Sequence, residues 1–337
     1  MTKQQPVDWR AVAAQLAAEF PCTRLHPVVV ERAAAGGRAV WGVALSGGAD
    51  SLALLLLLWA HWPKHRRRLR ALHFNHGLRG RASDADEKFC GRVCAALGVK
   101  FVHGRWRRKR SSVSEAEARA ARLVFFGRHA RIVWLGHQQD DIAETMLMRL
   151  ARGSGSAGLA APRPVQQLAG GRAHLRPLLT LKKAELVAAL KRAGAPWCDD
   201  ATNAGDEFFR NRVRRSVIPA WARAAQRDAL AGAARSRELL DEDNAALEAR
   251  VDDLRPLAAD RSLVLRPLAG QPRAIVRRAL HRWLLAQPRA GELVRQGFDA
   301  LLAAVERGTP ARHSLGREGF AVIRGGVLRF ERAERNR

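Results

Sequence analysis

The sequence predicts an α/β protein in two parts: a domain built on a parallel β-sheet over residues 1–216 and a mainly helical domain over 217–337. Three observations predict this fold. Short apolar runs alternate with helix-length segments in the first half, as in βαβ units. Such runs cease after about residue 177, where helical patterns take over. The last stretch alternates polar and apolar residues around Gly325 and Gly326, which is typical of a short β-hairpin.

The elements follow in order along the chain. An amphipathic helix is expected over residues 7–20. Strands separated by helices come next, and polar residues at their carboxyl ends are candidate site residues, because ligands bind there in parallel sheets. The predicted strands cover residues 38–45, 68–74, 99–104 and 130–136. The predicted later helices cover residues 179–194, 207–254 with a break at Pro219, 272–286 and 292–306.

Composition narrows the class of protein. The 337 residues are 47% hydrophobic, which suffices for packed cores and excludes disorder throughout. A total of 59 Lys and Arg against 32 Asp and Glu gives a formal net charge of +27, which favours a polyanionic partner such as nucleic acid. No apolar run reaches the roughly 18 to 20 residues of a membrane span, and the opening residues lack a signal-peptide core. We therefore expect a cytoplasmic protein with no membrane partner.

The four cysteines form neither a disulfide framework nor a CxxC pair. Cys90 and Cys94 are one helical turn apart, which is typical of small apolar residues on the buried face of a helix. Cys22 and Cys198 stand apart from them in the sequence. These spacings show no sign of a catalytic cysteine pair.

A polar turn, "SGGADS" (46–51), interrupts two apolar segments. Glycines after a strand let the chain turn tightly and aim successive N–H groups into a concavity, and the next helix adds its positive end. Such a turn favours phosphate. The dinucleotide motif GxGxxG and the lysine-containing GxxxxGK[ST] loop are both absent from this stretch. Helix capping alone would explain Asp50 or Ser51 singly, but not both beside two glycines.

This turn resembles the SGGxDS loop of the N-type ATP pyrophosphatases, the PP-loop enzymes. The resemblance implies a PP-loop ATP pyrophosphatase fold and an enzyme that splits ATP into AMP and pyrophosphate while adenylating an oxygen. By itself it leaves a carboxylate, a guanine precursor or a tRNA base open as the acceptor. It also implies that Asp50 lies at Mg²⁺. The residues it assigns to ATP are Ser46, Gly47, Gly48, Ala49, Asp50 and Ser51.

The segment "HFNHGLRG" (73–80) follows the second predicted strand and resembles an HxNHGLR motif of the same enzymes. Isolated histidines would more often be surface residues, but here several polar side chains crowd one strand end. The resemblance implies that His73, Asn75 and His76 contact the adenine and ribose of ATP. It assigns Arg79 to the tRNA or substrate.

The segment "GHQQDDIAETMLMRLARGSGSAGL" (136–159) is the most specific, and it is similar to a signature of the tRNA-isoleucine lysidine synthetases. On a helix that starts near Asp140, Asp141 and Glu144 are three residues apart and share one face. Acids in the first turn of a helix are common singly. Placed just after a strand, this pair would face the ATP site, where carboxylates hold Mg²⁺ or accept a proton from an amine.

Two further segments resemble the same family. In "SEAEARAARLVFF" (114–126), Arg119 and Arg122 match an ExxxRxxRY pattern, and Leu123 stands in place of the tyrosine, a residue this chain lacks entirely. Both arginines are candidates to stabilise charge on the α-phosphate. The block at 197–219 resembles WxxDxSNxDxxFxRNxxR, and it includes turn-forming residues that would order the loop. Its candidate tRNA or substrate contacts are Asn203, Arg210, Asn211, Arg212 and Arg214.

The resemblance implies a two-step reaction. The 2-carbonyl oxygen of the wobble cytidine in the CAU anticodon of tRNA(Ile) attacks the α-phosphorus of ATP and releases pyrophosphate. The ε-amine of L-lysine then attacks carbon 2 of the cytosine ring, which bears the adenylated oxygen, and expels AMP, forming lysidine. Asp141, helped by His137 or Glu144, would deprotonate the amine. The implied catalytic residues are Asp50, Arg119, Arg122, His137, Asp141 and Glu144.

Binding of the tRNA is expected to fall to the basic helical domain and to "RWRRKRSS" (105–112), through shape and phosphate contacts. Two alternatives remain open. One is another adenylating tRNA-modification enzyme such as a 2-thiolase, which would use paired cysteines or iron–sulfur ligands. The other is a non-catalytic RNA-binding protein, which would need the basic surface but not Asp50, Asp141 and Glu144 together.

Overall fold

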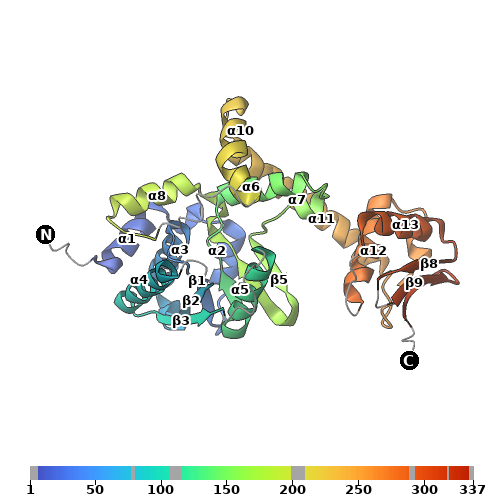
Figure 1. Cartoon of the computed structure of the whole chain (residues 1–337), viewed down its shortest axis with the longest axis horizontal. Coiled ribbons are helices and arrows are strands. Elements are labelled where there is room, and N and C mark those ends of the chain that lie inside the picture. The colour runs from blue at the N-terminus through green and yellow to red at the C-terminus, as the bar shows by residue number, and fades with distance from the viewer. Residues whose placement is uncertain are drawn as a thin grey trace. The chain divides into compact units, whose positions relative to one another are not determined.

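The structure, a computed structural model, describes residues 7–76, 80–106, 115–198, 209–287, 293–316 and 319–333 (Figure 1). It divides into two compact units, Met1–Leu239 and Leu240–Arg337. Helix α11 (Ala229–Leu254) contributes residues to both. Each unit is described by itself below.

The first unit contains a six-stranded sheet with the strand order β3-β2-β1-β4-β6-β5. The four strands expected from the sequence are present and pair in parallel, as predicted. Two further strands extend the sheet, and β5 runs antiparallel to β6. The strands are β1 (Trp41–Ala44), β2 (Leu69–Asn75), β3 (Lys100–Arg105), β4 (Ile132–Trp134), β5 (Val165–Leu168) and β6 (Arg172–Leu175).

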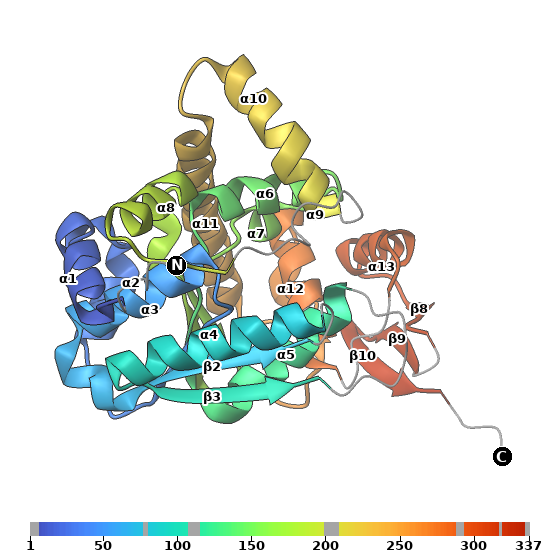
Figure 2. The same cartoon turned by 60° about the vertical axis from the view of Figure 1, so that its left-hand side comes forward.

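Helices cover both faces of this sheet, and α4 runs along β2 and β3 (Figure 2). The helices of this unit are α1 (Trp9–Glu19), α2 (Pro27–Ala34), α3 (Ala49–His61), α4 (Arg81–Leu97), α5 (Glu115–His129), α6 (Gln139–Leu150), α7 (Ser156–Leu159), α8 (Lys183–Arg192), α9 (Phe209–Arg212) and α10 (Ile218–Ala225). Short 3₁₀ turns lie at Cys22–Arg24, Pro63–Arg68, Ala169–Gly171 and Pro177–Thr180, and a π-helical turn at Val213–Val217.

Alternation along the strands divides the core between the two faces. Trp41 and Val43 of β1 pack into the cluster formed with α1, α3, α4 and α8, whereas Ala44 packs into the cluster on the α5 face. Helix α3 lies between the sheet and the helices α1 and α8, so its leucines 52 and 54–58 are all buried. Cys90 and Cys94 lie on the buried face of α4, as the sequence predicted.

Strand order reverses beside β1, because β2 pairs on one side of it and β4 on the other. The loops that follow β1 and β4 therefore leave the sheet next to each other at its carboxyl end. A crevice at such a reversal is where open α/β sheets bind their ligands. The sheet order thus brings the turn at 46–51 close to the segment that begins at Gly136.

The boundary between the two compact units falls between Leu239 and Leu240. This is later in the chain than the boundary predicted between residues 216 and 217. Ile218 and Leu230 belong to an apolar cluster with Ile142 of α6, so the start of the helical region packs on the first unit. Pro219 lies in the first turn of α10, and the helix is instead interrupted between Ala225, where α10 ends, and Ala229, where α11 begins. Gln226 has a left-handed backbone conformation, with φ of +49°.

The second unit combines α12 (Arg273–Ala286), α13 (Arg295–Arg307) and a 3₁₀ turn (Arg266–Leu268) with an antiparallel sheet of order β7-β10-β9-β8. The predicted hairpin is confirmed: β9 and β10 are joined by Gly325 and Gly326, both with positive φ. The strands are β7 (Leu263–Val264), β8 (Ala311–Ser314), β9 (Gly319–Arg324) and β10 (Val327–Arg332). Throughout the ranges described above, helices long and apolar enough for a bilayer are absent.

Candidate functional site

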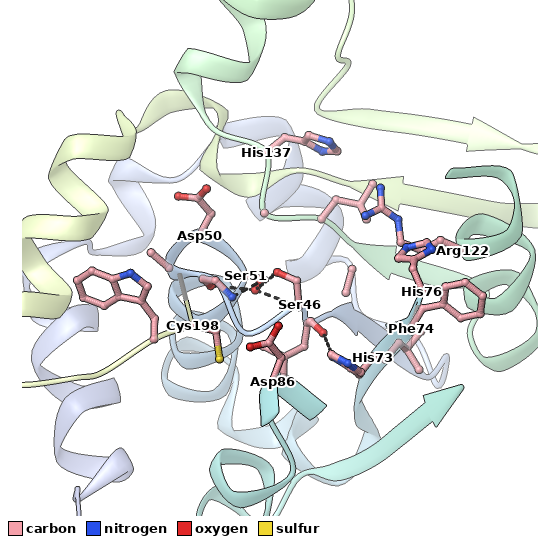
Figure 3. Close-up of a pocket in the computed structure, with 18 of the residues that line it drawn as sticks. Ser46, Asp50, Ser51, His73, Phe74, His76, Asp86, Arg122, His137 and Cys198 are labelled. Atoms are coloured by element: carbon pink, nitrogen blue, oxygen red, sulfur yellow. Dashed lines mark hydrogen bonds between the residues drawn. The ribbon is translucent and has the colours of Figure 1, made fainter. Parts of the chain in front are cut away.

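A cavity of about 550 Å³ opens at the carboxyl ends of β1, β2 and β4. Figure 3 shows Ser46, Asp50 and Ser51 on one side of it and His73, His76 and Arg122 on another. These residues come from three segments that the sequence singled out separately. The first two segments lie at strand ends, as expected, and Arg122 reaches the cavity from α5.

The turn at 46–51 is held by its own hydroxyl groups. The backbone N–H of Ser46 donates to Ser51 Oγ at 3.1 Å, and the two hydroxyls lie 3.0 Å apart. Ser51 Oγ donates in turn to the carbonyl of Gly48 at 2.9 Å. Helix α3 begins at Ala49, so its positive N-terminal end faces the cavity that Gly48, Ala49 and Ser51 line. This is an anion-binding arrangement.

Gly47 is required by both its conformation and its neighbours. Its φ is +96°, and a Cβ there would lie 3.0 Å from Cys198 Sγ and 3.3 Å from Cys90 Sγ. The N–H of Cys198 also donates to the carbonyl of Gly47 at 2.9 Å. Gly136, after β4, approaches the turn equally closely, because a Cβ on it would lie 3.0 Å from the carbonyl oxygen of Asp50. Neither contact between distant segments is visible in the sequence pattern.

Asp50 is mostly buried in the first turn of α3 and lines the cavity. Burial raises the pKa of its carboxyl to about 6, while the nearby Lys183 ammonium opposes this rise and the Asp141 carboxylate adds to it. Its Oδ1 is buried and accepts no hydrogen bond from the residues that the structure describes. A buried carboxylate oxygen facing a cavity in this way is suited to a cation.

The end of β2 supplies neutral and polar groups. His73 is buried, and its Nδ1 lies 2.9 Å from the carbonyl oxygen of Leu45. Burial lowers the pKa of His73, so the ring is uncharged at neutral pH. Asn75 is also buried, and its amide donates to Asp84 and Glu87 of α4. Asn75 therefore fixes the strand end against α4, in addition to lining the cavity.

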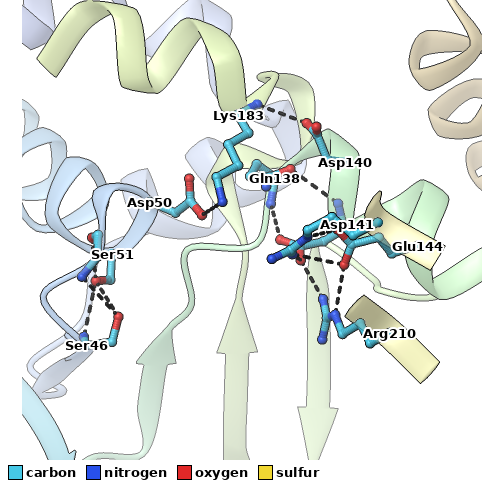
Figure 4. A network of polar contacts seen from close by, with 11 residues as sticks. Ser46, Asp50, Ser51, Gln138, Asp140, Asp141, Glu144, Lys183 and Arg210 are labelled. Carbon is cyan, nitrogen blue, oxygen red and sulfur yellow. Dashed lines mark hydrogen bonds and ion pairs between the residues drawn. The ribbon is translucent and has the colours of Figure 1, made fainter. Parts of the chain in front are cut away.

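Asp141 and Glu144 share one face of α6, as their spacing predicted, and they meet two arginines there (Figure 4). Arg210 Nη2 donates to Asp141 Oδ1 at 2.5 Å, and its Nε donates to Glu144 Oε2 at 2.8 Å. Arg214 Nη2 donates to Glu144 Oε2 at 3.0 Å and lines the cavity. Glu144 is fully buried. We call these four residues the α6 charge cluster.

The capping of α6 orients this cluster. Gln138 accepts a hydrogen bond from the N–H of Asp141, and Asp141 Oδ2 accepts one from the N–H of Gln138, which forms a reciprocal capping box. One carboxylate oxygen of Asp141 therefore holds the helix start, and the other faces Arg210. The sequence predicted the acidic face but not this cap.

His137 follows β4 and lines the cavity. Its Nδ1 accepts a hydrogen bond from Arg176 Nε at 3.2 Å. Burial first, and then the charges of Arg176 and Arg210, hold the pKa of His137 well below its usual value. With Nδ1 occupied, the proton of the neutral ring is on Nε2, so this side chain is arranged to donate a hydrogen bond rather than to take a proton.

The structure thus brings most of the predicted site residues together, although not all of them reach the cavity wall. Arg119 lies near enough to lower the pKa of His137 but does not line the cavity. Arg79 and Asn203 lie outside the described residues. Arg212 stacks over Phe209, and Asn211 is buried in α9. The predicted residues that line the cavity are Ser46, Gly48, Ala49, Asp50, Ser51, His73, Asn75, His76, Arg122, His137 and Arg214.

Some residues of the cavity were not predicted from the sequence. They are Lys183, at the start of α8, Asp86 of α4, and Trp197 and Cys198, the first two residues of the block at 197–219, to which the sequence assigned no role. Each belongs to an element whose pattern is that of an ordinary helix or loop. The available signal for Lys183 was its place in the first turn of a helix that follows a strand and faces the same sheet edge.

The residues present fit Mg²⁺ with ATP. Asp50 offers a buried oxygen without a described partner, and a magnesium ion held with substrate phosphates requires only one or two protein carboxylates. Groups of three or more metal-ligating side chains are absent from the described ranges. A cation there would therefore be shared between Asp50 and the ligand.

Comparison with known proteins agrees with this geometry. Residues 25–221 match the sequence profile of the PP-loop domain. The chain belongs to the PP-loop family. The matched residues include the turn at 46–51 and span the sheet, the cavity and the α6 charge cluster.

Three curated relatives of this PP-loop chain carry the same name. It is 43% identical over 193 residues to a tRNA(Ile)-lysidine synthase of Solibacter usitatus, covering 55% of this chain and 41% of that one. It is 37% identical over 287 residues to the synthase of Geobacter sulfurreducens, covering 78% and 58%. For the synthase of Xanthomonas campestris the values are 38% over 283 residues, 81% and 63%. The chain thus spans about two-fifths to three-fifths of the length of these relatives.

Among solved structures, the PP-loop chain is similar to the U34-tRNA thiolase NcsA of Methanococcus maripaludis, which contains a [4Fe-4S] cluster. The TM-score is 0.51 with 16% sequence identity, over 68% of this chain and 78% of that one. At this identity the likeness concerns the fold alone.

Proposed function

We propose that this PP-loop protein joins L-lysine to the 2-carbon of the wobble cytidine in a tRNA(Ile) with a CAU anticodon, with ATP split into AMP and pyrophosphate. The observation that carries the proposal is the α6 charge cluster beside a phosphate-binding turn. The turn accounts for ATP, and the cluster provides carboxylates for a cationic amine. The curated relatives named tRNA(Ile)-lysidine synthase support the choice of substrates.

The first step is adenylation of the base. The pyrophosphate of ATP binds to the N–H groups of the turn at 46–51 and to the N-terminal end of α3. Arg122, which lines the cavity, stabilises charge on the α-phosphate, with Arg119 behind it. The Nε2–H group of the neutral His137 donates a hydrogen bond to the same phosphate. His73, Asn75 and His76 bound the space for adenine and ribose.

Asp50 would hold Mg²⁺ together with the phosphates, and the ion, when bound, would offset the charge of the departing pyrophosphate. The turn keeps this carboxylate close to the start of α3. Its raised pKa reflects the cost of burying the ionised carboxylate, which the Lys183 ammonium 3.9 Å away only partly offsets. Binding of the cation with ATP is therefore favoured by relief of this charge.

The second step is attack by the ε-amine of lysine, which is protonated in water because its pKa is about 10.4. Asp141 and Glu144 attract the ammonium and lower the cost of placing it in the site. Both already bind Arg210 and Arg214, so the ammonium competes with these guanidinium groups for the carboxylate oxygens. Asp141 Oδ1 is the oxygen best placed to take the proton, because Oδ2 caps α6.

The anticodon base has to leave its stack to enter a cavity of this kind. The formal net charge of +27 supports binding of the tRNA backbone. We assign that binding to the basic second unit and to residues 105–112, which are mostly outside the described ranges. We propose a cytoplasmic location, in line with the proposed tRNA substrate.

The experiment supplies the chain with ATP, Mg²⁺, radiolabelled lysine and a tRNA with a CAU anticodon. The proposal predicts one lysine incorporated per tRNA and multiple-turnover pyrophosphate release that requires both tRNA and lysine. A tRNA with a GAU anticodon is the matched control and should incorporate none. Multiple-turnover pyrophosphate release that needs no lysine and gives no incorporation would contradict the proposal.

A sulfur donor replaces lysine in a parallel reaction, because a specific observation favours testing it. Cys90 and Cys198 are far apart in the sequence, yet both sulfur atoms lie within 3.3 Å of the position that a Cβ on Gly47 would occupy. A thiolase would incorporate the sulfur and ignore lysine. A non-catalytic RNA-binding protein would bind the tRNA and release no pyrophosphate in either reaction.

A further inference from the structure

Lys183 is the first residue of α8, and its side chain reaches the cavity beside the turn at 46–51. Its Nζ lies 3.9 Å from Asp50 Oδ2 (Figure 4). At this separation the two charges attract each other, but the ammonium donates no hydrogen bond to the carboxylate. The donors of Nζ are therefore available to a ligand that also binds Asp50.

The position of Lys183 is set by Asp140 of α6. Asp140 Oδ2 accepts a hydrogen bond from the backbone N–H of Lys183 at 2.9 Å. One residue earlier, the N–H of Gln139 donates to the carbonyl of Leu181 at 2.8 Å. These two bonds join the start of α6 to the start of α8. The carboxylate of Asp140 is also favourable at a helix N-terminus, where the dipole is positive.

A phosphate-binding turn commonly works with a lysine, and the turn at 46–51 contains none. The compact, strongly hydrated charge of a lysine suits phosphate oxygens and needs no fixed planar geometry. Lys183 brings such a charge from another element to the side of the turn where Asp50 lies. A cation at Asp50 would be shared with the phosphates of the ligand. Those phosphates would then lie within reach of the Nζ of Lys183.

We infer that Lys183 binds the β- and γ-phosphates of ATP and that Asp140 is its positioning residue. This inference rests on the proposed use of ATP and adds a residue to it. The two neighbouring aspartates then have different tasks. Asp140 fixes the start of α8 and so the phosphate-binding lysine, and Asp141 belongs to the α6 charge cluster.

The chain provides a matched control in Lys182. Its side chain is as exposed as that of Lys183, at 38%. Its Nζ, however, pairs with Asp228, and Lys182 does not line the cavity. Replacing either lysine removes the same charge from adjacent positions, so a difference between the variants reports the location of the ammonium rather than net charge.

The first test measures binding by titration calorimetry, with α,β-methylene-ATP and Mg²⁺ as one probe and AMP as the other. We expect Lys183→Met to weaken the analogue roughly 10- to 100-fold, the range of a lost charge-assisted hydrogen bond, and to change AMP binding less than about twofold. Lys183→Arg should recover most of the affinity. Lys182→Met should bind both probes as the unaltered chain does. Retained AMP binding shows that Lys183→Met is folded.

Unchanged affinity of Lys183→Met for the analogue would overturn the inference and leave the use of ATP intact. An unaltered chain that binds no analogue would overturn both. If Lys183 only neutralises Asp50, analogue and AMP would weaken together as the fold is lost, and that outcome would also contradict the inference.

The second test concerns Asp140 and follows pyrophosphate release with varied ATP. Asp140→Ala should raise the KM for ATP more than it lowers kcat, because the start of α8 loses its anchor. Asp140→Asn should behave like the unaltered chain, since the amide oxygen accepts the same hydrogen bond from the N–H of Lys183. A lower melting temperature of Asp140→Ala with an unchanged KM would mean a merely structural role and would contradict the inference.

Discussion

Two networks of arginine and carboxylate side chains, one in each unit, use the same chemistry in different surroundings. In the α6 charge cluster, Glu144 is fully buried and binds Arg210 and Arg214. In the second unit, Glu248 of α11 binds Arg278 and Arg282 of α12, and it is 34% exposed. Arg282 also pairs with Asp252, which is 69% exposed. We call this second set the α11–α12 network.

The two networks differ in how much they lower the stability of the folded protein when a partner is lost. Burying a carboxylate is unfavourable unless its partners are well placed, and removing one partner leaves an unpaired charge inside the protein. The α11–α12 network is partly exposed, so solvent screens it more than the buried cluster and its ion pairs contribute less. Burial of the α6 charge cluster is therefore energetically unfavourable, and charged groups buried beside a cavity are typical of a functional site. The α11–α12 network serves to join two helices.

The largest expected effect separates the two glutamates. Glu144→Ala should lower the free energy of unfolding by about 3–5 kcal/mol, because two guanidinium groups lose their buried partner. Glu248→Ala, the matched control, should lower it by less than about 1 kcal/mol. Denaturant unfolding of the full chain, followed separately for each unit, measures both. Equal losses would contradict the distinction between the networks.

A second effect concerns Asp50, whose folded-state pKa of about 6 lies above its usual value of 3.8. A carboxyl with a raised pKa costs stability when ionised, so its cost is complete above pH about 6 and disappears as the pH falls toward 4. Asp50→Asn should therefore stabilise the chain at pH 7 by on the order of 1–3 kcal/mol. The gain should shrink below pH 6. Melting temperatures across this range check it, and a destabilised Asp50→Asn at pH 7 would be incompatible with the account.

The smallest effect is the response of the α11–α12 network to acid and salt. Burial acts to raise the pKa of Glu248, but the hydrogen bonds from Arg278 and Arg282 outweigh it and lower the pKa below the usual 4.5. The stability that Glu248 contributes is thus present above pH 4.5 and is lost as the pH falls through its lower folded value. Added salt should weaken the same contribution by a few tenths of a kcal/mol. Glu248→Gln should be insensitive to both, and an identical acid response in that variant would argue against this network.

Much of the fold could be predicted from local pattern. The four parallel strands follow from short apolar runs, and the hairpin at Gly325 and Gly326 follows from alternation around two glycines. Strand β5 (VQQL) escaped prediction because it is an edge strand with polar residues, and β6 (RAHL) because it is short and its His174 is polar although buried. The two compact units divide after Leu239, later than the predicted boundary at 216, because apolar residues such as Ile218 and Leu230 signal burial without indicating which unit they pack on.

The site was predictable where its geometry is local and unpredictable where it is not. Asp141 and Glu144 lie three residues apart on a helix, so their common face could be foreseen. The contacts of Arg176 with His137, of Lys183 with Asp50 and of Cys198 with Gly47 join distant segments. Periodicity contains no information on such pairs. They arise only when the parallel sheet brings the ends of β1 and β4 together.

The central claim is that the turn at 46–51 binds the pyrophosphate of ATP in a tRNA-modifying ligase, and that Asp50 is essential to this binding. The most direct measurement compares the unaltered chain with Asp50→Ala in two assays, lysine incorporation into tRNA with a CAU anticodon and binding of that tRNA by filter retention. We predict that Asp50→Ala loses incorporation by at least about 100-fold and binds the tRNA as tightly as before. Lysine incorporation by Asp50→Ala at the normal rate would contradict the account.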